Sequence, residues 1–577
     1  MKKSLLDLPE IRESPKISQD PEYWRCLEEF ADSDEFRDRI SREFPQQAAG
    51  WHDGVSRRDF LKVMGASLAL AGLNACGQAA PRDEKIVPYV SQPEEMAIGK
   101  PMFFATAFPM SGAGTGILVE SHQGRPTKVE GNPNHPASLG ATDAFAQASI
   151  LTLYDPGRSQ VVSHAGAIST RSAFLTAIDE ALQQERLSGG AGLRILTETV
   201  TSPTLADQLR QLLVKFPRAK WHQYEPVNRD NAQAGARLAF GEDVNPIYWV
   251  DRADLILSFA ADFLFAGPGS LRYARDFARK RRVRKDKTDM NRLYVIEATP
   301  SVTGAMADHR FPLRPSEIPK VAALIAIKSG LSLPLASEAQ GPRWLDALAG
   351  DLERHRGRSI VLAGEQQPPA VHAIAHAMNQ ALENVGKTVI YTDPIEASPV
   401  NQTTSLRELV KEMEAGAVKF LLLLGGNPVF TAPVDLRFAE NLSKVPFRVH
   451  LSLYEDETSA YCHWHIPEAH YLESWSDIRA YDGTVTILQP LIAPLYGAKS
   501  AHEILAAVLG KAEEPAYDTI RNYWTGRKTA GDFEIFWRTA LHDGVVAGTA
   551  FPPKPVKLRP VTSFEFQASD SEIQNSK

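Results

Sequence analysis

Residues 420–428 read Phe-Leu-Leu-Leu-Leu-Gly-Gly-Asn-Pro, an apolar run that stops at a pair of glycines. Consecutive apolar residues bounded by turn formers are typical of a strand buried on both faces, as in a parallel sheet. Open α/β sheets bind ligands beyond the carboxyl ends of such strands. Gly425, Gly426, Asn427 and Pro428 are therefore candidate ligand contacts, although the same residues would serve equally well as a tight turn.

Similar apolar runs recur along the chain and are separated by stretches with helical periodicity. This alternation indicates an α/β fold in which helices cover both faces of parallel sheets. The strands that we predict are 193–197, 220–224, 255–260, 293–297, 359–363, 388–391, 420–424 and 448–453. We group them into two doubly wound parallel-sheet domains, 165–335 and 336–496.

The remaining segments have other compositions. Residues 101–164 contain short alternating strands and predict a small β-rich domain. Residues 497–577 predict a partial C-terminal region with a disordered polar tail. Residues 1–76 form a leader, and residues 77–100, rich in proline and charge, form a linker.

Charge and cysteine content exclude several classes of function. Lys and Arg number 63 against 70 Asp and Glu, a net charge of −7, so we expect no nucleic-acid partner. The only cysteines are Cys26, Cys76 and Cys462. This chain alone therefore cannot build a four-cysteine iron–sulfur cluster or a disulfide framework. It also lacks the Gly-x-Ser-x-Gly elbow of hydrolases and the phosphate-binding loop of nucleotide hydrolases.

Residues 462–470, Cys-His-Trp-His-Ile-Pro-Glu-Ala-His, invite a metal hypothesis. Thiolate and imidazole are common ligands of zinc and copper. The candidates are Cys462, His463, His465 and His470. On a strand, however, the first two histidines share one face and the cysteine points to the other, so we expect no metal site here.

The leader contains an export signal. Residues 56–62 read Ser-Arg-Arg-Asp-Phe-Leu-Lys and match the twin-arginine pattern through Arg57 and Arg58. The apolar run 63–75 that follows is too short to cross a bilayer, which takes about 20 residues, but suits a signal peptide. The run ends Leu-Asn-Ala-Cys, similar to the lipobox of bacterial lipoproteins. We therefore expect export, acylation of Cys76 and a lipid anchor on the periplasmic side of the cytoplasmic membrane.

Two sets of residues resemble a known family. Residues 23–29, Tyr-Trp-Arg-Cys-Leu-Glu-Glu, stand before the export motif as in the variant leader of the B subunits of alternative complex III, a membrane quinol oxidase. Residues 131–136, Gly-Asn-Pro-Asn-His-Pro, and 154–158, Tyr-Asp-Pro-Gly-Arg, resemble the N-terminal region of molybdopterin oxidoreductases. The resemblance extends from residue 23 to about residue 496.

This resemblance implies a molybdopterin-oxidoreductase-like fold that has lost its cofactor. It implies a non-catalytic structural subunit that supports a ferredoxin-like iron–sulfur subunit, beside integral-membrane quinol-oxidising subunits and c-type cytochromes. The iron–sulfur clusters are expected on a partner or on a missing C-terminal half, and no cofactor is expected in this chain. In cofactor-bearing relatives the loop matching residues 425–428 lies along the pterin nucleotide, which makes this loop vestigial here.

A second interpretation is a catalytic molybdopterin subunit, similar to polysulfide or tetrathionate reductases, with an unusual metal ligand. By the resemblance, that ligand would fall near residues 226–231, where Asp230 could serve. Against this interpretation, residues 139–143 contain no cysteine at the position where relatives hold the last ligand of an iron–sulfur cluster.

Overall fold

The computed structural model describes residues 99–284, 288–333, 342–527 and 531–560, all within one compact unit, Pro93–Lys577. The predicted export signal and lipidation site, Arg57, Arg58 and Cys76, lie outside the described residues. Among the described residues, no helix is both long and apolar enough to cross a membrane.

The N-terminal part of the described chain is a three-stranded antiparallel sheet. Its strands are β1 (Met102–Met110), β2 (Ala113–His122) and β3 (Arg125–Gly131), in the order β1-β2-β3. Helix α5 (Ala144–Leu153) packs against β3 and begins at Asp143, whose side chain accepts a hydrogen bond from the Ala146 amide. These strands and this helix lie within residues 101–164, where the sequence predicts short strands.

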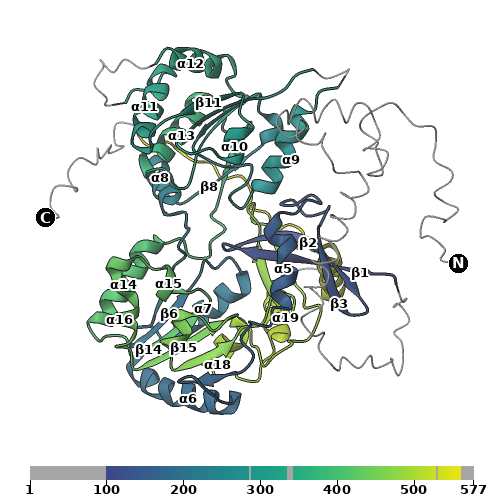
Figure 1. Cartoon of the computed structure of the whole chain (residues 1–577), viewed down its shortest axis with the longest axis vertical. Helices are drawn as coiled ribbons and strands as arrows, with labels where there is room; N and C mark the ends of the chain where they lie inside the picture. Colours follow the sequence, from purple (N-terminus) through teal and green to yellow (C-terminus); the bar gives the residue numbers. More distant parts are fainter. Residues whose placement is uncertain (1–98, 285–287, 334–341, 528–530, 561–577) are drawn as a thin grey trace, which may run out of the picture. The chain divides into compact units, whose positions relative to one another are not determined.

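The largest sheet has seven strands in the order β5-β4-β16-β15-β14-β6-β7, and its strands β6, β14 and β15 are labelled in Figure 1. The strands are β4 (Ser163–His164), β5 (Ala167–Ile168), β6 (Leu193–Thr197), β7 (Lys220–Gln223), β14 (Phe420–Leu424), β15 (Phe447–Ser452) and β16 (Trp464–Pro467). The five strands from β7 to β16 are parallel, and β4 and β5 add an antiparallel edge.

At strand β14, helices cover both faces of this sheet. Phe420, Leu422 and Leu424 contact α6 (Arg171–Ser188), α7 (Pro203–Lys215) and α18 (Ala501–Val508), whereas Leu421 and Leu423 face α14 (Gln402–Glu414) and α16 (Phe438–Leu442). Alternate residues of a strand point to opposite faces, so an all-apolar strand needs helices on both sides.

A second parallel sheet has the order β11-β10-β9-β12. Its strands are β9 (Leu255–Phe259), β10 (Arg292–Glu297), β11 (His309–Pro312) and β12 (Ser359–Ala363). Helices α11 (Ile318–Lys328), α12 (Trp344–Arg354) and α13 (Pro369–Ala381) pack against it, and an antiparallel pair, β8 (Asn245–Tyr248) with β13 (Val389–Thr392), lies beside it in the same core.

The two sheets do not follow the predicted grouping into domains 165–335 and 336–496. The first segment contributes β6 and β7 to the seven-stranded sheet and β9, β10 and β11 to the other sheet. The second segment is divided in the same way, because β12 joins β9 while β14 joins β6. Apolar runs identify strands, but they do not say which strands pair when one sheet is inserted between strands of another.

The C-terminal part adds a hairpin and helices to the β region. Strands β17 (Ser476–Arg479) and β18 (Val485–Leu488) pair antiparallel. Helices α19 (Ala516–Arg527) and α20 (Phe533–Asp543) pack against this hairpin. Strand β18 and α20 also contact β1, so the predicted partial C-terminal region packs against the N-terminal strands.

Candidate functional site

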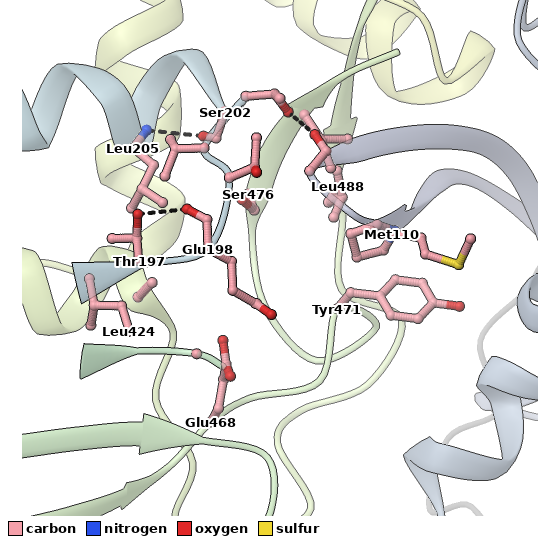
Figure 2. A pocket seen from close by; sticks show the side chains of 18 of the residues that line it. Met110, Thr197, Glu198, Ser202, Leu205, Leu424, Glu468, Tyr471, Ser476 and Leu488 are labelled. Carbon is pink, nitrogen blue, oxygen red and sulfur yellow. Dashed lines mark hydrogen bonds between the residues drawn. The ribbon is translucent and has the colours of Figure 1, made fainter. Parts of the chain in front are cut away.

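A cavity of about 660 Å³, here called the strand-end cavity, lies beyond the carboxyl ends of β6, β14 and β16 (Figure 2). Strand β6 connects through α7 to β7 on one side, and β14 connects to β15 on the other. Chain connections that diverge from two neighbouring strands mark the position where open α/β sheets bind ligands. The turn between β1 and β2 and the start of β17 close the cavity.

Two glutamates dominate this cavity. Glu198 follows the last residue of β6, and Glu468 follows the last residue of β16. Figure 2 shows both side chains pointing into the same space. Glu225, which lies just beyond β7, and Asp477, on β17, also line it, and Asp477 is held by Thr204 at 2.5 Å and by Trp524 at 2.9 Å.

Glu198 and Glu468 hold their protons more strongly than carboxyls in water. Burial, helped by the neighbouring Glu225, raises the pKa of Glu198 to about 7. Burial, helped by the charge of Glu198, raises the pKa of Glu468 to about 8. The Glu198 side chain is exposed to the cavity itself, so its environment is a pocket within the protein and not open solvent. Low polarity and like charge both disfavour the ionised form.

The lining of the strand-end cavity does not fit an anionic cofactor. The lining contains Glu198, Glu225, Glu468 and Asp477, and no lysine or arginine is among these described lining residues. A molybdopterin dinucleotide carries pyrophosphate, which proteins bind with basic side chains or with amides at helix N-termini. The described lining offers no basic side chain, and the amides of Thr204 and Leu205 at the start of α7 already donate to Asp477 and Ser202.

The glycine pair after β14 makes room for Glu198. Gly425 and Gly426 have φ angles of +76° and +70°, in the left-handed region that favours glycine. A Cβ atom on Gly425 would lie 2.9 Å from a Glu198 carboxylate oxygen. The predicted ligand loop therefore contacts an acidic side chain at the mouth of the cavity.

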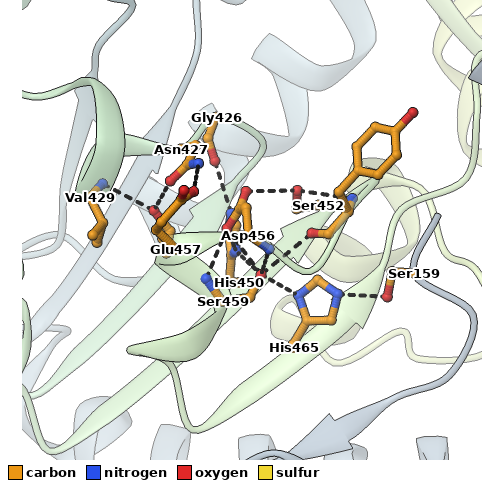
Figure 3. A network of polar contacts seen from close by, with 12 residues as sticks. Ser159, Gly426, Asn427, Val429, His450, Ser452, Asp456, Glu457, Ser459 and His465 are labelled. Atoms are coloured by element: carbon orange, nitrogen blue, oxygen red, sulfur yellow. Dashed lines mark hydrogen bonds and ion pairs between the residues drawn. The ribbon is translucent and has the colours of Figure 1, made fainter. Parts of the chain in front are cut away.

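The rest of this loop is occupied by internal hydrogen bonds (Figure 3). The Asn427 amide donates to Glu457 at 2.6 Å, and its oxygen accepts from the Thr458 hydroxyl at 2.7 Å. The His450 ring lies 3.0 Å from the Gly426 carbonyl. Pro428 begins the short helix α15 (Pro428–Thr431). These contacts are those of a fixed turn, the structural alternative that the sequence left open.

The four residues weighed as metal ligands have separate partners. Cys462 is buried in an apolar cluster, where burial raises the pKa of its thiol to about 12. His463 accepts from the Arg448 amide at 3.2 Å. Its neighbour His465 lies 2.6 Å from the Ser159 hydroxyl. No group of three or more potential ligands of the His, Cys, Asp or Glu type converges in the described part of the chain.

His470, the fourth residue, lies 3.0 Å from the Thr152 hydroxyl, and its amide donates to Glu473 at 2.9 Å.

Asp230, the alternative ligand for a metal, is already occupied by hydrogen bonds from two backbone amides. Its two oxygens accept from the amides of Gln402 and Thr403 at 2.8 and 3.0 Å, at the start of α14. Asp230 therefore caps a helix.

A second cavity, of about 230 Å³, lies beyond β9 and β12. Its one described basic side chain, Arg229, is neutralised by Glu365 at 3.3 Å and Glu396 at 3.6 Å. This volume is below the roughly 300–1,000 Å³ typical of ligand pockets, and far smaller than a pterin dinucleotide requires.

Comparison with known proteins agrees with this architecture. No protein-family profile matches the chain. The chain is 25% identical over 464 residues to the menaquinone reductase, molybdopterin-binding-like subunit, of Nitratidesulfovibrio vulgaris. The match covers 72% of this chain and 65% of that relative, so this chain spans less than two thirds of the relative's length.

Among solved structures, acetylene hydratase from Pelobacter acetylenicus superposes with a TM-score of 0.51 at 12% identity, over 73% of this chain and 71% of that one. The predicted molybdopterin-oxidoreductase-like α/β fold is thereby confirmed.

Sequence analysis missed Glu198 and Glu468 as site residues. The available signal was a charged residue directly after an apolar strand.

Proposed function

We propose that this chain is a non-catalytic, molybdopterin-oxidoreductase-like subunit of a membrane-associated complex that exchanges electrons with quinones. The similarity to a menaquinone reductase subunit supports the quinone-linked class. The leader phrase at residues 23–29 favours an assembly of the alternative complex III type. In this assembly a ferredoxin-like partner carries the iron–sulfur clusters, and integral-membrane quinol-oxidising subunits and c-type cytochromes complete the path.

The observation that carries the non-catalytic role is the acidic lining of the strand-end cavity. Glu198 and Glu468 stand at the edge of the sheet where an anionic nucleotide cofactor would need positive charge. Asp230, the remaining candidate ligand to a metal, is committed to the first turn of α14. The chain's contribution is then mechanical, as a rigid body on which redox-active partners are positioned.

Buried polar contacts give this body its rigidity. Arg158, which follows α5, forms a two-pronged ion pair with Glu473 at 2.6 and 3.1 Å, and both side chains are fully buried. Asn132, after β3, donates to the Asp543 carbonyl at the end of α20 at 2.8 Å. Such contacts join segments far apart in the sequence and fix their relative positions.

Purification of the tagged chain from native membranes in mild detergent tests this proposal. We expect co-purification of an iron–sulfur protein and an integral-membrane subunit, with quinol oxidation by the complex. The double variant Glu198→Gln/Glu468→Gln should assemble and retain this activity. Loss of activity in an intact variant complex, or purification of the chain without redox partners, would contradict the proposal.

Export is tested separately through the leader. The double variant Arg57→Lys/Arg58→Lys should leave the precursor in the cytoplasm, because the twin-arginine pair is the predicted recognition element. Normal delivery of this variant would remove the proposed export route without touching the assignment of the fold.

A further inference from the structure

Helix α9 (Ser270–Arg281) presents two chemically different faces. Its inner face buries Tyr273 and Phe277 in the core beside the second sheet, and the Phe277 ring meets Phe263 edge-on at 6.3 Å. Three cations on or near that side are paired with acids of the chain. These pairs are Arg272 with Asp276, Lys280 with Asp254, and Arg281 with Asp308.

The outer face is cationic and exposed. We name the α9 ridge from its four exposed arginines, Arg275, Arg279, Arg282 and Arg284. The first three follow the spacing i, i+4, i+7 of one helix face. Within the described part of the chain, none of the four makes a hydrogen bond or ion pair with an acidic side chain, so their charge is available to an external anion.

The helix dipole explains only part of this arrangement. Cations are favoured at a helix C-terminus, but the effect is confined to the last turn. Arg275 lies six residues before the final residue of α9, and Arg284 lies beyond its end. Compensation of the dipole accounts for Arg279, in the last turn, and for Arg282, the C-cap residue. Stabilisation of the helix end therefore does not explain Arg275 or Arg284.

We propose that the α9 ridge binds the anionic head groups of phospholipids and holds this domain against the membrane. Guanidinium groups pair with phosphate oxygens through two parallel hydrogen bonds. Val283, which stands between Arg282 and Arg284 in the sequence, is 52% exposed and suits insertion between head groups. The net charge of the whole chain is −7, so attraction to an anionic surface must come from a local patch of this kind.

The proposed lipid anchor would bring the α9 ridge close to the membrane. The inference therefore rests on the proposed export and acylation of the chain. Residues 77–100 connect Cys76 to the segment that begins with β1, so an acyl anchor on Cys76 would tether the chain that carries the ridge to the bilayer. Tethering raises the effective concentration of the ridge at the surface, which turns weak individual contacts into stable docking.

Vesicle co-sedimentation of the full chain carrying Cys76→Ser tests the ridge without an acyl anchor. The probes are phosphatidylcholine vesicles with and without phosphatidylglycerol. The ridge variant is R275Q/R279Q/R282Q/R284Q. The matched control, R210Q/R218Q/R407Q/R437Q, removes four exposed arginines elsewhere. The leader is common to all variants, so differences between them report the substituted arginines.

We expect the ridge variant to bind anionic vesicles at least about tenfold more weakly, because each arginine near an anionic surface contributes about fivefold. The control should stay within about twofold, and salt should reduce the binding of the parent chain. Equal losses in both variants, or equal binding to neutral and anionic vesicles, would overturn the proposal. So would a ridge variant that keeps vesicle binding but loses an acidic protein partner from the purified complex. The vesicle-binding experiment does not depend on which redox complex the chain belongs to.

Discussion

Glu198 and Glu468 directly follow the last residues of two strands of one sheet, β6 and β16, and their carboxyl groups enter the same cavity (Figure 2). At the edge where open α/β sheets bind their ligands, this chain places two acids with raised pKa values. The described lining of this edge contains carboxyl groups and no lysine or arginine. This relationship is the basis of the non-catalytic role that we propose.

The two carboxyls predict a pH dependence of stability. The unfolded chain releases their protons near the ordinary pKa of 4.5, whereas the folded chain keeps them until about pH 7 and pH 8. Between these values the folded state binds more protons, so stability falls as pH rises from about 5 to about 8.

The variant Glu198→Gln/Glu468→Gln should remove this part of the fall. Its urea midpoint should match that of the parent chain near pH 5 and exceed it near pH 8. A control variant, Glu440→Gln, changes an exposed glutamate and should leave the profile unchanged. Identical pH profiles for the parent chain and the double variant would show that these carboxyls titrate normally.

The buried pair Arg158–Glu473 predicts a large and non-additive loss of stability. Glu473 also accepts from the amides of His470 and Leu495, both at 2.9 Å. Glu473→Gln should therefore lower the free energy of unfolding by about 3–5 kcal/mol, because it leaves the Arg158 charge buried without a counter-ion.

The double variant Arg158→Met/Glu473→Gln should be less destabilised than the sum of its two single variants, since it removes the orphaned charge. Glu353→Gln breaks an exposed pair with Arg356 and should cost no more than about 1 kcal/mol. Chemical denaturation measures all four proteins. Additive effects at Arg158 and Glu473 would mean that the pair is not coupled as its geometry indicates.

Asp230 is predicted to act on stability and not on metal content. Asp230→Ala removes the acceptors of two amides at the start of α14 and should cost about 1–2 kcal/mol, as loss of a helix cap does. Asp435→Ala, at an exposed position, should change stability by less than about 0.5 kcal/mol. A variant of Asp230 with unchanged stability but altered metal binding would restore the interpretation of this residue as a ligand.

The sequence predicted individual strands well because burial on both faces leaves a strong local signal. The bounds of β6, β12 and β14 match the predicted 193–197, 359–363 and 420–424. The pairing of β6 with β14 was not predictable, because more than 200 residues, including the whole second sheet, intervene. Pairing across an insertion depends on tertiary packing, which local periodicity does not encode.

The candidate site was predictable only in part. A buried strand followed by glycines indicates the ligand edge of a sheet, and Gly425 of the predicted loop lines the strand-end cavity. Glu198 and Glu468 were missed, since a single glutamate carries no motif and the two come from strands 270 residues apart in the sequence. The histidines near Cys462 formed a suggestive pattern, but each has a different partner: the Arg448 amide for His463, Ser159 for His465 and Thr152 for His470.

Lipidation can be tested at Cys76, which lies outside the described residues. Cys76→Ser should abolish acyl incorporation, which mass spectrometry of the mature N-terminus would detect. Cys26→Ser, which changes a cysteine upstream of the predicted cleavage site, should leave acylation intact. An unmodified mature N-terminus upstream of residue 76 in the parent protein would remove the lipoprotein assignment.

The central claim is that this fold works without a pterin-bound metal, and elemental analysis tests it most directly. The tagged chain is purified from native membranes, and molybdenum and tungsten are measured by inductively coupled plasma mass spectrometry, with a known molybdopterin enzyme as the positive control. We predict molybdenum and tungsten at the level of the buffer blank, because the strand-end cavity is lined by acids and Asp230 is engaged at α14. One atom of either metal per chain would contradict the account.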